Sequence, residues 1–150
     1  MFAFPTKKAF LISSCFLWCV LVCNAQKRPF DKQKIDSILR VSETMEKDMK
    51  TVQLLVSSAG KNRYIKPTRT LIQRAIAISE AADDNEMRAN SYYSMGNYHY
   101  FNAKLDSASY MLDKALTYIS DDELPFIRSG ILATKGGISS QNDAVSQSIV

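Results

Sequence analysis

The side chains that most often do chemistry in proteins are scarce in this sequence. Its three cysteines, Cys15, Cys19 and Cys23, all fall within the first 25 residues, and His99 is the only histidine. A structural zinc site, a disulfide framework or a cysteine nucleophile with its base needs more of these residues than the rest of the chain contains. No nucleophile and base can be paired around His99, which also disfavours a hydrolase. We therefore expect a protein that is not an enzyme, with no metal, no cofactor and no small-molecule substrate.

The remaining polar patterns indicate structure rather than chemistry. Residues 57–61 superficially suggest a phosphate-binding loop, but the Gly-x4-Gly-Lys-Ser/Thr spacing is absent. The acidic residues at 83–86 lack the spacing of a calcium loop, so helix capping is the better interpretation, as it is for 121–123. Glu43, Glu46 and Asp48 suit a solvated helix face. His99 is expected to be packed in the core.

The first 25 residues have the layout of a targeting segment. Lys7 and Lys8 precede an apolar run that ends at Cys23, and the small residue Ala25 offers a cleavage point. This order is typical of a secretory signal peptide, and the run is short for a membrane-spanning helix, which needs about 20 apolar residues. An uncleaved anchor, or a lipid anchor at Cys15, stays open as an alternative. The prediction is an exported protein of the periplasm or cell envelope.

Composition and charge exclude other classes. The chain is 46% hydrophobic and 23% charged, with 5 Gly and 4 Pro, which suits a helical globular domain. Its formal net charge is +4, to which Lys7 and Lys8 contribute without any acidic residue in the same segment. No clustered Lys/Arg stripe follows, so we expect no nucleic-acid partner.

Apolar periodicity predicts that any site is positioned by helices. Residues 26–34 read as a linker, and the first helix of region 26–47 begins near Ile35. Asp48 is expected to cap a second helix, and Pro67 to open a third. Further helices are predicted over 86–102 and 105–119, and from Pro125 to a stop at Gly136. No segment alternates with a period of two. The fold class is all-α, with antiparallel helix hairpins joined by short connections.

Segment 89–120 carries aromatic, apolar and small residues at fixed spacings: Tyr92, Met95, Gly96, His99, Ala108, Leu112, Ala115 and Leu116. This pattern resembles the tetratricopeptide repeat (TPR), with His99 and Ser120 departing from the usual Tyr and Pro. Glycine inside a helix costs about 1 kcal/mol relative to alanine. Gly96 is therefore expected to allow close approach of the hairpin's second helix, where Ala108 and Ala115 would meet it.

Weaker copies of the pattern flank this segment. Ile72, Ala75 and Ile76 lie 40 positions before Leu112, Ala115 and Leu116. On the other side, Leu132 and Gly136 lie 40 positions after Tyr92 and Gly96, against a usual period of about 34. We expect TPR-like repeats over 48–150, stacked as a short α-solenoid. Because the last apolar stripe has no polar cap, the chain is expected to be truncated at its C-terminus.

The resemblance implies a concave groove lined by first-helix positions of the repeat, here Asn90, Tyr93, Asn97, Tyr100 and Phe101. These side chains would bind a peptide, although packing against the next repeat is an open alternative. The basic residues of the chaperone-tail-binding members are missing at Tyr93 and Phe101, although Asn97 matches one position of their clamp.

The expected function is an exported protein-interaction module that binds a peptide or protein segment. The arrangement is also similar to the exported N-terminal region of bacterial sensor histidine kinases and regulators. The alternative is therefore the input domain of a membrane signalling protein, of which this chain is a fragment. A membrane would be reached only through residues 1–25 or a missing C-terminal part.

Overall fold

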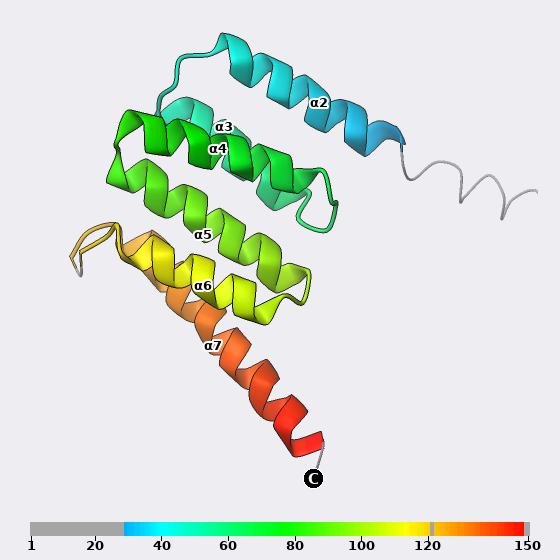
Figure 1. The fold of residues 1–150 in the computed structure, drawn as a ribbon, viewed down its shortest axis with the longest axis vertical. Coiled ribbons are helices and arrows are strands. Elements are labelled where there is room, and N and C mark those ends of the chain that lie inside the picture. The colour runs from blue at the N-terminus through cyan, green and yellow to red at the C-terminus, as the bar shows by residue number, and fades with distance from the viewer. Residues whose placement is uncertain (1–28, 121, 149–150) are drawn as a thin grey trace, which may run out of the picture. The chain divides into compact units, whose positions relative to one another are not determined.

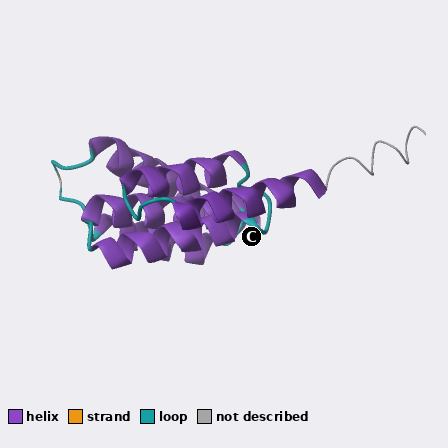
Figure 2. Ribbon diagram, turned by 90° about the horizontal axis from the view of Figure 1, so that it is seen from above, coloured by secondary structure: helices purple, strands orange, loops and turns teal. Residues whose placement is uncertain are grey.

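A computed structural model describes residues 29–120 and 122–148 of the chain. Over these residues the regular structure is entirely helical, as Figure 2 shows, so the all-α fold class is confirmed. The helices are α2 (Pro29–Thr44), α3 (Met49–Lys61), α4 (Thr68–Ala82), α5 (Asn85–Phe101), α6 (Leu105–Leu116) and α7 (Pro125–Ser148). The predicted signal segment 1–25, with its cleavage and lipidation alternatives, lies outside the described residues.

The chain divides into two compact units, residues 1–34 and residues 35–150. Helix α2 begins at Pro29, so the expectation that 26–34 is a linker is wrong for its second half. Proline suits a first helical position because its fixed φ and missing N–H cost nothing there. Helices α3 to α7 all belong to the second unit, in which Ile35 is 1% exposed.

Aspartates begin two of the helices. The Asp48 carboxylate accepts a hydrogen bond of 3.0 Å from the backbone N–H of Thr51, and Asp84 accepts one of 2.9 Å from that of Met87. The bond from Thr51 holds the pKa of Asp48 below its ordinary value. Pro67 occupies the N-cap of α4, one position before its first helical residue. Sequence therefore predicted these helix starts to within one residue.

Helices α3 to α7 contact only near neighbours along the chain. Each packs against the next helix along the chain. In addition, α3 contacts α5, and α5 contacts α7. No such contact joins α4 to α6 among the described residues. Figure 1 shows α4, α5 and α6 running antiparallel, followed by α7, whose C-terminal half extends past α6. One side of α5 consequently faces both α3 and α7.

Gly96 lies where α5 and α6 approach most closely. A Cβ at this position would be 2.6 Å from Cδ2 and 2.7 Å from Cγ of Leu112, and 3.4 Å from the backbone oxygen of Ala108. Leu112, Ala108 and Ala115 are all 0% exposed. The expected close approach is therefore present, but the side chain of Leu112, rather than Ala115, fills the space that the glycine leaves.

Helix α7 corrects the expectation of a stop at Gly136. It runs without a break through Gly136 and Gly137 to Ser148. A Cβ on Gly137 would lie 2.7 Å from the hydroxyl of Tyr100, whereas a Cβ on Gly136 would meet nothing within 4 Å. One of the two glycines therefore serves packing between helices, and the pair is not a helix terminator.

Burial repeats along the chain in the register expected for the first two hairpins. Val52 and Ala59 are buried on α3, and Tyr92 and His99 are buried 40 positions later on α5. On α7 the corresponding buried pair is Ile131 and Ile138, 39 positions after that. The expected match of Tyr92 with Leu132 is wrong, because Leu132 is 52% exposed. Gly96 allows close approach of a neighbouring helix, whereas Gly136 has no neighbour within 4 Å of a Cβ position.

Candidate functional site: a groove between α3 and α5

An open groove of about 440 Å³ lies between the C-terminal turns of α3 and one face of α5. Its first wall is the last two turns of α3 with the start of the following connection, its second wall is α5, and Ile72 of α4 also lines it. The residues that line it are Val56, Ser57, Ala59, Gly60, Lys61, Arg63, Ile72, Tyr93, Ser94, Asn97, Tyr98 and Phe101. Its size is in the range of pockets that hold small ligands or short peptide segments.

The groove combines apolar walls with hydrogen-bond donors. Ala59, Ile72 and Tyr98 belong to the hydrophobic cluster beneath it, while Ser57, Ser94 and Asn97 place polar groups along it. The Asn97 Oδ1 atom accepts a hydrogen bond of 3.0 Å from Oγ1 of Thr134 on α7. This bond orients the amide so that its Nδ2 donors remain for other acceptors.

One end of the groove is positively charged. Lys61 and Arg63 line it, and no Asp or Glu does. The Arg63 guanidinium carbon lies 4.3 Å from the centroid of the Phe101 ring, a cation–π contact that holds the side chain over α5. In the part of the chain that the structure describes, neither cation has a carboxylate partner. By contrast, Arg88 pairs with both Asp83 and Glu80.

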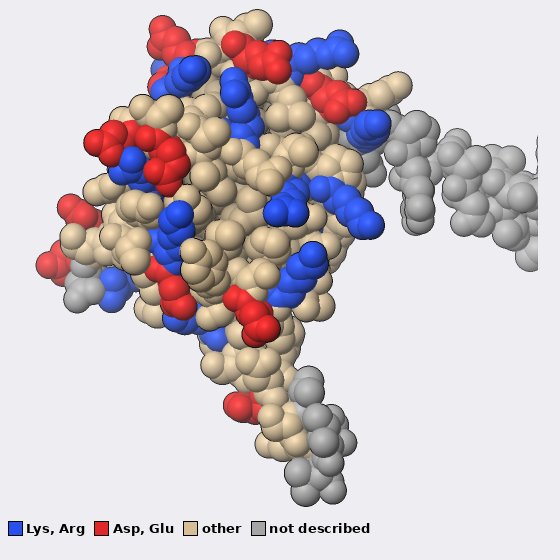
Figure 3. Space-filling view, viewed as in Figure 1, with Lys and Arg blue, Asp and Glu red and all other residues tan. Residues whose placement is uncertain are grey.

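The positive charge extends beyond the groove itself. Residues 61–79 contain Lys61, Arg63, Lys66, Arg69 and Arg74 and no acidic residue. On the face in Figure 3, blue side chains follow the edge where the α3–α4 and α5–α6 connections lie, and red ones gather towards the α4–α5 connection. On this face, the unit formed by α3 to α7 is therefore more basic at one end of its helices and more acidic at the other.

The five residues predicted to form the groove fall into three groups. Tyr93, Asn97 and Phe101 line the groove between α3 and α5. Tyr93 and Asn97 also contact α7, Tyr93 through its hydroxyl beside Gly130 and Asn97 through its hydrogen bond from Thr134.

The other two predicted residues lie elsewhere. Tyr100 packs on α7 beside Gly137 and accepts a hydrogen bond of 3.2 Å from Gln141. Asn90 is half-buried and lies outside the groove. The two interpretations, groove and repeat packing, therefore share these residues.

The α3 wall was missed as a site from sequence. Residues 57–61 were considered only as a phosphate loop, and the structure places all of them within α3, so no such loop exists there. Val56 and Arg63 carry no sequence pattern that indicates a site, and Gly60 is suggested only by the rejected phosphate loop. The one available signal was charge, since five basic residues and no acidic one occupy 61–79. Which wall faces α5 depends on contacts between separate hairpins, which local patterns do not specify.

His99 is a core residue, as expected, at 7% exposed. Burial lowers its pKa from the ordinary value, and the nearby cations Arg69 and Lys104 lower it further. Its ring stands edge-on to Tyr98, 5.6 Å between centroids, and Nδ1 is buried without a hydrogen-bond partner in the structure. It does not line the groove.

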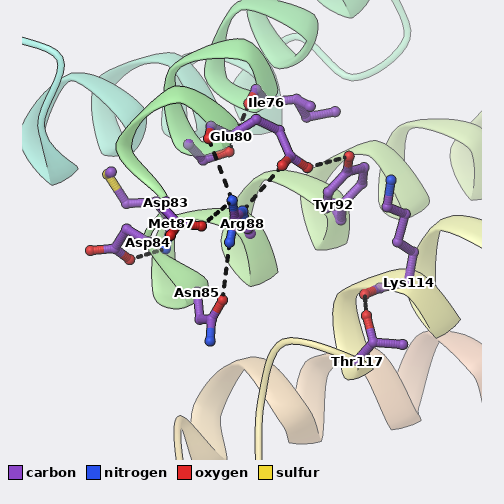
Figure 4. A network of polar contacts seen from close by, with 11 residues as sticks. Ile76, Glu80, Asp83, Asp84, Asn85, Met87, Arg88, Tyr92, Lys114 and Thr117 are labelled. Atoms are coloured by element: carbon purple, nitrogen blue, oxygen red, sulfur yellow. Dashed lines mark hydrogen bonds and ion pairs between the residues drawn. The ribbon is translucent and has the colours of Figure 1, made fainter.

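A second polar cluster joins α4, α5 and α6 away from the groove (Figure 4). The Tyr92 hydroxyl donates a hydrogen bond of 2.8 Å to Glu80, and Nε of Arg88 lies 3.2 Å from the same carboxylate. The Lys114 ammonium lies 4.2 Å from the Tyr92 ring centroid, and Tyr118 stacks on that ring at 5.7 Å. Burial is the main cause that raises the pKa of Tyr92. Because its charges pair with one another, this cluster serves as a clamp between helices.

Within residues 29–120 and 122–148, no group of three or more His, Cys, Asp or Glu side chains is placed to hold a metal ion. None of the helices described is both long enough and apolar enough to cross a membrane. No family model, curated protein or solved structure matches this chain.

Proposed function

We propose that this chain is a helical-repeat, TPR-like interaction module that binds a peptide segment of another protein in the groove between α3 and α5. The observation that carries the proposal is that this groove stays open, while the equivalent surface between α5 and α7 is closed by Tyr93 and Tyr100 packing on Gly130 and Gly137. Residues 1–25 favour a setting outside the cytoplasm, where the partner would be met.

The chemistry of the walls supports a peptide as occupant. Tyr93 and Phe101 supply large contact surfaces that lose little conformational entropy, as is common where proteins bind peptides. The amide of Asn97 and the hydroxyls of Ser57 and Ser94 suit backbone groups of an extended chain. The repeating burial of α3 with α4 and of α5 with α6 supports the TPR-like description.

Gly60 offers a test that leaves the fold intact. A Cβ there would meet nothing within 4 Å, and no glycine in the described residues has a positive φ. Gly60→Trp should therefore fold normally while its indole occupies the groove. The matched control is Gly136→Trp, because Gly136 on α7 is equally open and lies outside the groove.

The measurement is selection from a random peptide library displayed on phage, followed by affinities of the selected peptides. We expect peptides that bind the wild type and Gly136→Trp alike and lose at least tenfold in affinity for Gly60→Trp. Circular dichroism would verify that all three proteins have the same helix content. Peptides that bind Gly60→Trp as tightly as the wild type would refute the groove as the binding site.

A further inference from the structure

The charges around the groove indicate which kind of segment it takes. We propose that the α3–α5 groove binds an acidic peptide segment whose backbone crosses α3 at Gly60 and whose side-chain carboxylates pair with Lys61 and Arg63. This inference rests on the proposed function and specifies its ligand.

Two cations on the groove wall are available to a ligand. Lys61 and Arg63 are exposed, they line the groove, and no carboxylate within the described residues pairs with them. The guanidinium of Arg63 is held over the Phe101 ring at 4.3 Å. A guanidinium fixed in this way keeps its N–H donors available, and the loss of side-chain entropy on pairing with a carboxylate is reduced.

Other basic residues lie at the same end of the unit as Lys61 and Arg63. Arg69 lies in the first turn of α4 and Lys104 directly precedes α6, so both lie at the end of the unit where α3 and α5 finish. Lys61, Arg63 and Lys66 lie at the same end, so five basic residues gather there against Asp106 in the first turn of α6, and residues 61–79 contain no acid. An acidic segment would be drawn to this end, whereas a basic one would be repelled.

Gly60 differs from the glycines that pack against a neighbouring helix. Packing explains Gly96, Gly130 and Gly137, since a Cβ on each would lie under 3.0 Å from a neighbouring side chain. Gly60 has no such neighbour and no unusual φ, yet it lies on the groove wall directly before Lys61. Glycine permits close approach of a ligand backbone, which a side chain on this turn of α3 would prevent.

The probe is an acetylated, amidated hexapeptide with two central leucines between pairs of glutamates, labelled for fluorescence anisotropy. Its counterpart has glutamine in place of every glutamate. The protein variants are Lys61→Gln/Arg63→Gln and, as a control of equal net charge, Lys47→Gln/Lys50→Gln. The two control residues are exposed and lie at the opposite end of α3.

We expect the glutamate peptide to bind the wild type and the Lys47→Gln/Lys50→Gln control at least tenfold more tightly than the glutamine peptide does. Lys61→Gln/Arg63→Gln should abolish this difference, and raising the salt from about 0.05 to 0.5 M should reduce it. Gly60→Trp should weaken the binding of both peptides. Equal affinity for the two peptides, or an unchanged preference in Lys61→Gln/Arg63→Gln, would overturn the proposal.

Two further outcomes separate the inference from the proposed function. Neutral peptides that bind in a Gly60-dependent manner without any acidic preference would refute the inference and leave the function standing. If no peptide depends on Gly60, both fail. A single-stranded oligothymidine that binds as tightly as the glutamate peptide, and loses affinity in Lys61→Gln/Arg63→Gln, would also refute the inference, because the basic end would then recognise polyanions in general.

Discussion

Single glycines in this chain have different roles that depend on what surrounds them. All of those in the described residues lie within helices, where glycine costs about 1 kcal/mol relative to alanine. At Gly96 the cost is offset because Leu112 occupies the space of the missing Cβ. At Gly136 nothing within the chain occupies that space. Equal substitutions at these two positions should therefore have opposite effects on the free energy of unfolding.

Gly96→Ala should lower the free energy of unfolding by about 1–3 kcal/mol, the usual cost of overpacking a core. The added Cβ would need Leu112 to move, and Leu112 is 0% exposed and surrounded by buried neighbours. Gly136→Ala should raise it by up to about 1 kcal/mol through helix propensity alone. Urea unfolding followed by circular dichroism measures both. A Gly96→Ala protein at least as stable as the wild type would contradict the close approach of α5 and α6.

At the scale of the elements, α7 is held on α5 by aromatic side chains that fit against glycines. The hydroxyls of Tyr93 and Tyr100 would lie 2.3 Å and 2.7 Å from a Cβ on Gly130 and Gly137. The hydrogen bond between Thr134 and Asn97 lies between these two contacts along the helices. The seven-residue spacing of both pairs keeps them on one face of each helix.

The pair of Tyr100 and Gly137 can be tested by a double-mutant cycle. Relative to Gly136→Ala, which gains the same helix propensity, Gly137→Ala should be less stable by about 1 kcal/mol, because its new Cβ overlaps the Tyr100 hydroxyl. Tyr100→Phe removes that oxygen, and the next atom, Cζ, lies 3.2 Å away, so the double variant should regain most of the loss. Additive effects in thermal unfolding would show that the two residues do not meet.

Sequence patterns predicted the elements well where the signal was local. The carboxylates of Asp48 and Asp84 and the stripe around Leu71 and Ala75 each act within a turn or two, and the structure agrees. The register predicted for α7 is wrong because its buried residues follow those of α5 at a spacing of 39 rather than 40 positions. One residue turns a helix face by about 100°, so Leu132 was expected in the core where Ile131 lies.

At the scale of the unit formed by α3 to α7, the groove could be predicted only in part. The signature at 89–120 indicated which face of α5 would line a groove, and Tyr93, Asn97 and Phe101 do line one. Its other wall comes from α3, whose position depends on packing between hairpins far apart in sequence. No local sequence pattern around Gly60 or Arg63 indicates that α3 forms this wall. Contacts between hairpins thus decide where the groove lies, whereas contacts within a helix or hairpin decide the helices.

The same pattern of neighbour contacts predicts how stability is distributed. Among the described helices, α5 touches α3, α4, α6 and α7, whereas α7 touches only α5 and α6. The described side chains after Ile138 in α7 are exposed. In repeat-like stacks each unit is stabilised mainly by its neighbours, so helices at an edge open more easily than central ones.

Native-state hydrogen exchange read by mass spectrometry should therefore give the highest opening free energies for amides of α5, and clearly lower ones for α7. The lowest values in α7 should fall after Ile138. Compared with Gly136→Ala, Gly137→Ala should lower the protection of α7 and leave that of α3 and α4 the same, because neither of these helices contacts α7. If α5 and α7 opened with one common free energy, the unit would unfold as a single block and its stability would not follow the neighbour contacts seen between its helices.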